Sequence, residues 1–198
     1  KGQNFDEIKI RVNELKNLKV LVLGETIIDQ YIFCEALGKS GKEPVLVLRD
    51  LKLDQYAGGA VAITGATNVA LGQVVNPSGT TNITATAGSI SDATAAEGSG
   101  NENVSGTTIT LSSATGVGAT GAANDVDVAG TTLVASASGT GGIYLAETDG
   151  VALGTISTSA GAINVTAGGA VTTSANLTAA GGALGIAGVG ITNTNTLT

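Results

Sequence analysis

The sequence predicts a mainly β protein whose larger part is a β-solenoid, and three observations carry this prediction. Apolar residues alternate with small polar ones at residues 108–111 and 163–166, and a period of two is the signature of strands. Residues 107–109 recur 24 positions later at 131–133, and a period in the twenties with short strands is typical of solenoids. Beyond residue 64 the only aromatic residue is Tyr144, which suits a narrow interior.

The period of two also predicts which side chains face the interior. In a strand, alternate side chains point to opposite faces. We therefore expect Thr108 and Thr132 to point outward. The repeat, together with the even spacing of Gly106, Gly130 and Gly154, predicts coils of about 24 residues. The side chains expected to point inward and to stack between these coils are Ile109, Leu133, Ile143, Leu145, Ile163 and Val165.

The composition of the 198-residue chain changes sharply after Lys52. All nine Lys and Arg lie at or before that residue, whereas nine of the sixteen acidic residues lie in residues 1–54 and seven lie beyond. The tail therefore carries the whole net charge of −7. An acidic chain argues against a nucleic acid partner, because phosphate neutralisation needs an excess of Lys and Arg. This break divides the chain into a head, residues 1–64, and a tail, residues 65–198.

The residue inventory excludes several kinds of site. The chain has no His, which removes His-based catalytic triads and His-ligated metals, and its single Cys excludes an internal disulfide and a Cys-based zinc site. No segment reaches the roughly 18 apolar residues of a membrane span. We expect no catalytic residue, no metal and no cofactor in the chain as it stands.

The head has the pattern of a small, incomplete α/β unit. Residues 4–18 carry apolar side chains at helical spacing, and residues 20–23 form an unbroken apolar run that fits a buried parallel strand. Further strands are expected at residues 31–34 and 45–48. The Gly-Gly pair at 58–59 is expected to lead into a helix that starts at residues 61–63.

Three motifs of the head resemble the start of a ribokinase-like (PfkB) sugar kinase of the heptose-phosphate-kinase type. They are GETIIDQY at 24–31, ALGKSGKEPV at 36–45 and YAGGA at 56–60. The resemblance implies that Asp29 holds sugar hydroxyls and that Gly58 and Gly59 lie against the sugar. The late motif that supplies the family's ATP site and catalytic Asp is absent from the chain. ATP and Mg²⁺ therefore enter only under the alternative that the chain is a kinase fragment.

Three stretches of the tail resemble the repeats of large bacterial exoproteins of the filamentous-haemagglutinin type. They lie at residues 79–90, 142–151 and 161–169. The resemblance implies a right-handed parallel β-helix that is exported to the cell surface, often for adhesion. The tail thus suggests a secreted or surface location and the head a cytoplasmic one, so the localisation stays open.

The tail itself offers little chemistry. Asp125 with Asp127, and Glu147 with Asp149, are spaced to share an edge and hold Ca²⁺. Solvated corner acids that aid solubility are the favoured interpretation, because the pattern is not that of calcium-binding repeats. Thr pairs such as Thr108 and Thr110 raise the idea of an ice-binding surface, but in the sequence these pairs do not recur at the coil period.

Two functions follow from these observations. The first is a non-catalytic structural or adhesive solenoid segment of a bacterial surface or secreted protein, fused to a truncated sugar-kinase start. The alternative is a fragment of a PfkB-family kinase that phosphorylates a sugar in lipopolysaccharide-sugar metabolism. The expected partners are a cell-surface or carbohydrate ligand and further copies of the chain, joined through uncapped solenoid ends. A natural fusion, a misassembled reading frame and an artificial sequence would each explain the join near residue 64.

Overall fold

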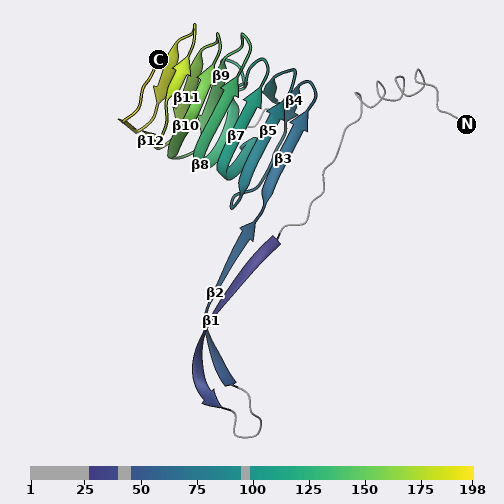
Figure 1. Cartoon of the computed structure of the whole chain (residues 1–198), viewed down its shortest axis with the longest axis vertical. Coiled ribbons are helices and arrows are strands. Elements are labelled where there is room, and N and C mark those ends of the chain that lie inside the picture. Colours follow the sequence, from purple (N-terminus) through teal and green to yellow (C-terminus); the bar gives the residue numbers. More distant parts are fainter. Residues whose placement is uncertain (1–26, 40–45, 95–98) are drawn as a thin grey trace, which may run out of the picture.

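The computed structural model describes residues 27–39, 46–94 and 99–198, and the described chain is all β. Figure 1 shows strands β3 to β15 stacked in one body, with a two-stranded hairpin extending from it. The strands are β1 (Ile27–Lys39), β2 (Leu46–Gly58), β3 (Ala60–Gly65), β4 (Val69–Leu71), β5 (Thr80–Ala85), β6 (Ile90–Asp92), β7 (Val104–Ser113), β8 (Val126–Ala137), β9 (Ile143–Glu147), β10 (Val151–Thr158), β11 (Ile163–Ala167), β12 (Ala170–Thr173), β13 (Leu177–Ala179), β14 (Leu184–Ala187) and β15 (Gly190–Asn193). No helix occurs in these ranges, and hence none that could cross a membrane.

The stacked strands form a parallel β-solenoid of about six coils. One wall contains β3, β5, the second half of β7 and of β8, then β10, β12 and β15, and each strand pairs in parallel with the next. β13 belongs to the same wall, because it pairs in parallel with the second half of β10. One column of aligned residues runs through Ala60, Thr80, Thr108, Thr132, Ala152, Thr172 and Thr192. The solenoid predicted from the alternation and the repeat is confirmed.

The coil length is not constant, which corrects the fixed period predicted from the sequence. Along the column just described, the step from Thr80 to Thr108 is the longest, the step from Thr108 to Thr132 is intermediate, and all other steps are shorter and equal. Gly106 does align with Gly130, but Leu153 aligns with Leu133, so Gly154 lies beside Val134 and leaves the glycine series. Strands stack at one register whatever the length of the corner loops, and longer loops account for the two longer steps.

A second wall is built from the short strands on the other side of the core. Val69 of β4 pairs with Ile90 of β6, and the bridges from Ile90 to Val117 and from Val117 to Ile143 continue the column. Strands β9, β11 and β14 complete this wall, all in parallel. The start of β8 pairs with the end of β9, at Val128 and Glu147, and so links the two walls at a corner.

The core consists of columns of Ile, Leu and Val that run along the axis between the walls. All six side chains expected to point inward are buried, with exposed fractions of 0 or 1 %. Strand β11 alternates strictly between buried and exposed positions, and Thr108 and Thr132 stand on the partly exposed outer side of β7 and β8. The period of two therefore assigned these positions correctly. Each coil covers the apolar side chains of the coil before it, which is the main source of stability in such a stack.

The described part of the head is an antiparallel hairpin of β1 and β2, with Ile27 opposite Gly58. The strand expected at 31–34 lies inside β1, and residues 46–48 lie in β2. The expected helix at 4–18 and the strand at 20–23 fall outside the described residues. The helix start at 61–63 is wrong, because residues 60–65 form β3. Val61 and Ile63 alternate there with more exposed neighbours and pair with β5 of the solenoid.

Candidate functional site

The residues predicted to contact sugar lie at the base of the hairpin. Asp29 pairs with Tyr56, Gly58 pairs with Ile27, and Gly59 follows as the link between β2 and β3. The backbone register thus brings Asp29 and Gly58 to the same end of a two-stranded antiparallel ribbon. Their role in holding a sugar stays a prediction.

The outer side of the first wall carries columns of hydroxyl and amide groups, and we call it the hydroxyl face. The strand register aligns Thr80, Thr108 and Thr132 in one column and Thr84, Ser112 and Ser136 in another. Figure 1 shows their strands, β5, β7 and β8, side by side. The face comprises Thr80, Asn82, Thr84, Thr108, Thr110, Ser112, Thr132, Ser136, Ser157, Thr172, Thr178 and Thr192. Ala152, Val134 and Gly154 interrupt the columns.

The sheet contains a regular column of single Thr residues that is not apparent in the sequence. The Thr pairs themselves do not recur from coil to coil, as expected, because Thr110 lies between Asn82 and Val134. In space, Thr80 lies directly beside Thr108, and Thr108 beside Thr132. Because the corner loops differ in length, this regular column is visible in the paired strands but not in the sequence.

Outer and inner Thr hydroxyls differ in their bonding. The inward Thr81 Oγ1 donates to the carbonyl oxygen of Ser105 at 2.9 Å, and the inward Thr173 hydroxyl bonds Oδ1 of Asn193 at 2.6 Å. Across the described chain, the side chains of Thr80, Thr108 and Thr132 make no hydrogen bond to protein. Each of these three hydroxyls can both donate and accept, so it is available to water or to a ligand. The outer hydroxyls of Ser112 and Ser136, by contrast, bond each other at 3.3 Å.

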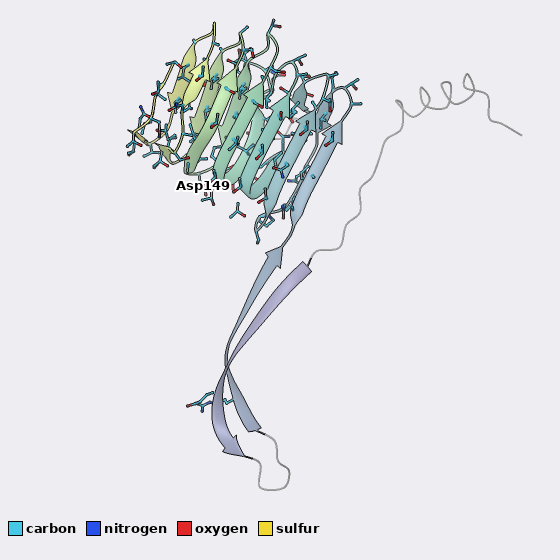
Figure 2. All side chains as sticks on the ribbon, in the orientation of Figure 1. Asp149 is labelled. Atoms are coloured by element: carbon cyan, nitrogen blue, oxygen red, sulfur yellow. The ribbon has the colours of Figure 1, made fainter. Side chains whose placement is uncertain are left out.

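The hydroxyl face carries no charge, because the acids of the tail lie elsewhere. Two of them are inside the solenoid: Asp127 is 6 % exposed and Glu147 is 4 % exposed. The interpretation of these residues as solvated corner acids is therefore wrong. Asp149 is exposed, and Figure 2 shows it at the lower edge of the stacked strands in that view. Within the described ranges, no group of three or more acids or Cys is arranged to hold a metal ion.

Glu147 occupies the last inward position of β9, in phase with Ile143 and Leu145. Its carboxyl accepts hydrogen bonds from the N–H of Gly130, at 3.1 Å to Oε1 and 3.2 Å to Oε2. Burial raises the pKa of the Glu147 carboxyl to about 8, the negative charge of Asp149 adds to the rise, and the bond from Gly130 opposes it. The period of two, continued from Ile143 and Leu145, assigns Glu147 to the inner side of the strand. It was not assigned there from the sequence because an acidic side chain is not expected in a core.

Asn103 is a fully buried polar residue, and no pattern in the sequence marks it as part of the core. Its side-chain amide donates to Oδ1 of Asp92 at 2.6 Å and to the carbonyl oxygen of Leu71 at 3.3 Å, and its Oδ1 accepts from the N–H of Asp127 at 2.8 Å. One side chain thus ties together three successive coils at the end of the longest loop.

We expect Asn103→Ala to cost about 2–4 kcal/mol of stability, because it removes several buried hydrogen bonds at once and leaves their partners unpaired. Urea denaturation followed by circular dichroism measures the loss. The matched control is Asn164→Ala, at an exposed position of β11, for which a change within about 0.5 kcal/mol is expected. Equal effects of the two substitutions would contradict a structural role for Asn103.

Comparisons of the chain with protein families, with curated proteins and with solved structures found no match. The resemblances of the head and of the tail therefore rest on the sequence motifs alone. The parallel solenoid agrees with the β-helix repeats that the tail motifs imply.

Proposed function

We propose that this chain is a non-catalytic structural or adhesive solenoid segment that uses its hydroxyl face to contact neutral polysaccharide at a bacterial surface. The observation that carries the proposal is the register of the first wall. It aligns the hydroxyls of Thr80, Thr108 and Thr132, which make no hydrogen bond to other protein groups, in a straight column. The surface location rests on the resemblance of the tail to exoprotein repeats.

The geometry favours a ligand that is itself repetitive. Neighbouring strands lie about 4.8 Å apart, and residues two apart along a strand lie about 6.6 Å apart. The hydroxyls therefore form a two-dimensional array that is fixed by the backbone. Thr is stiff at χ1 because it is β-branched, so little side-chain entropy is lost on binding. A polymer of sugars presents many hydroxyls at regular intervals and can engage several rows at once, which strengthens weak individual contacts.

Charge further narrows the class of ligand. An anionic polymer requires cations on the protein, and no Lys or Arg occurs beyond Lys52. A cationic polymer would be drawn to the acidic side chains, which lie off the hydroxyl face. The uncharged face therefore fits a neutral polymer. No feature of the described residues favours the kinase alternative, and we do not propose it.

A sedimentation assay with insoluble polysaccharides tests this function. The full chain is mixed with cellulose, with β-1,3-glucan and, as an anionic comparison, with an insoluble alginate. We expect saturable binding to at least one neutral polymer and none to alginate. The triple variant Thr80→Val, Thr108→Val and Thr132→Val keeps the side-chain shape and removes three hydroxyls. Its affinity should fall about tenfold or more, since each hydrogen bond contributes about 0.5–1.5 kcal/mol.

The matched control is Thr166→Val, which removes an exposed hydroxyl from β11 on the other wall. This variant should bind like the unchanged protein. Equal binding by the triple variant would place the contact on another surface, and the absence of binding to both neutral polymers would overturn the adhesive proposal. Thermal melting of each variant confirms that the solenoid is intact.

A further inference from the structure

The carboxyl of Glu147 lies between two coils rather than at the surface. Its residue pairs with Val128 of the preceding coil and with Ala167 of the following one. The side chain is 4 % exposed, and the N–H of Gly130 is directed at both carboxyl oxygens. An acid thus continues the inward row that Ile143 and Leu145 begin in the same strand.

Every charged group near this carboxyl is negative. Asp149 follows it at the same corner, and Asp127 on β8 is buried beside its partner strand. Glu102 reaches the same corner, where its Oε1 accepts a hydrogen bond from Thr148 Oγ1 at 3.0 Å. β10 and β11, which follow β9 in the stack, contribute no charged side chain. The solenoid has no Lys or Arg, so an ionised Glu147 has no opposite charge within its own fold.

We propose that Glu147 makes the pairing of β9 with β8 sensitive to pH, so that these two strands separate locally in alkaline solution. With the carboxyl protonated, the coil closes over it and the Gly130 corner is packed. When the carboxyl loses its proton in alkaline solution, a charge is left inside the stack, and the corner around residues 126–130 and 143–151 opens to water. Ionisation of an unpaired buried group is costly, and exposure relieves that cost.

The direction of the effect follows from linkage. The pKa of Glu147 is about 8 in the folded protein against 4.5 as its ordinary value, so the folded form holds a proton that the unfolded chain has released. This contribution to stability is fully present below about pH 4.5 and is lost progressively as the pH rises toward 8. Ordinary surface carboxylates with lowered pKa values would give the opposite slope.

Hydrogen exchange and denaturation at several pH values test the proposal on the full chain. Between pH 5 and pH 9 the folding equilibrium constant should fall roughly 700-fold, as pKa values of 4.5 in the unfolded chain and about 8 in the folded protein require. Exchange protection, corrected for the intrinsic pH dependence, should be lost in peptides covering residues 126–150 before it is lost in residues 163–179. Glu147→Gln keeps an oxygen that accepts the Gly130 hydrogen bond and cannot ionise, so this variant should lack both effects.

Asp149→Asn serves as the control, because it removes a neighbouring charge from an exposed position. Because the charge of Asp149 raises the pKa of Glu147, this variant should keep the fall in stability, make it slightly smaller and complete it at slightly lower pH. Identical pH profiles for the unchanged protein and Glu147→Gln would overturn the proposal, as would a loss of protection spread evenly over all coils. These measurements involve no polysaccharide, so their outcome does not depend on whether the adhesive function is correct.

Discussion

Replacing Ile109 by Asp is expected to destabilise the solenoid by about 4 kcal/mol or more, the largest effect expected of a single core substitution. Ile109 is fully buried on β7, between Thr81 and Leu133 in the adjoining coils. Its side chain also fills the corner beside Gly106 and Gly130, where an added Cβ would lie 3.2 and 2.8 Å from its atoms. Asp would leave this space partly empty and place a charge in it, and the solenoid has no Lys or Arg to pair with that charge.

The matched control lies one residue away. Thr108→Asp places the same carboxylate on the outer side of the same strand, where water solvates it, and should cost under about 1 kcal/mol, mainly through the poor strand propensity of Asp. Urea denaturation gives the two free energies of unfolding. Because trypsin has no cleavage site beyond Lys52, proteolytic protection is followed with elastase or thermolysin. Equal destabilisation at the two positions would show that residues 108 and 109 do not differ in burial.

The inward set could be predicted because it depends only on local alternation. Ile143, Leu145, Ile163 and Val165 are separated by single small or polar residues, and each pair belongs to one strand. Whichever coil a strand stacks on, these side chains share a face. The same rule would have assigned residues 61 and 63 to a strand, had the preceding Gly pair not been interpreted as the start of a helix.

The coil length could not be predicted in the same way, because it depends on loops that carry no period. The regular spacing of Gly106, Gly130 and Gly154 indicated a constant coil length. Only the first two glycines are aligned, while Gly154 lies within β10 beside Val134. In a chain with 30 Gly, an even spacing of three glycines is weak evidence for a period.

The candidate site was missed for a related reason. The hydroxyl face becomes visible only when strands are aligned by their pairing, since more of the chain separates Thr80 from Thr108 than separates Thr108 from Thr132. The buried acids were missed because charge usually marks a surface position. Glu147 departs from that rule, and its neutral form at moderate pH explains how the core tolerates it.

Substituting Gly161 by Ala is the second change with a large expected effect. Gly161 is buried at a corner, and a Cβ added there would lie 2.1 Å from the carbonyl oxygen and 2.4 Å from the carbonyl carbon of Gly141 in the preceding coil. Gly182 in the next coil meets Gly161 in the same manner, with its added Cβ 2.4 Å from the Gly161 carbonyl carbon. The glycines at this corner thus let successive coils approach more closely than any side chain permits.

Because the obstructing atoms belong to the backbone, they cannot turn aside as a flexible side chain would. Gly161→Ala must therefore separate two coils locally, and we expect a loss of about 3 kcal/mol or more, at the upper end of overpacking costs. Gly72→Ala is the matched control, because an added Cβ there meets nothing within 4 Å, and it should be neutral or stabilising by up to about 1 kcal/mol through the unfolded chain. Urea midpoints compare the two variants, and a neutral Gly161→Ala would mean that the coils at this corner stand further apart than the structure places them.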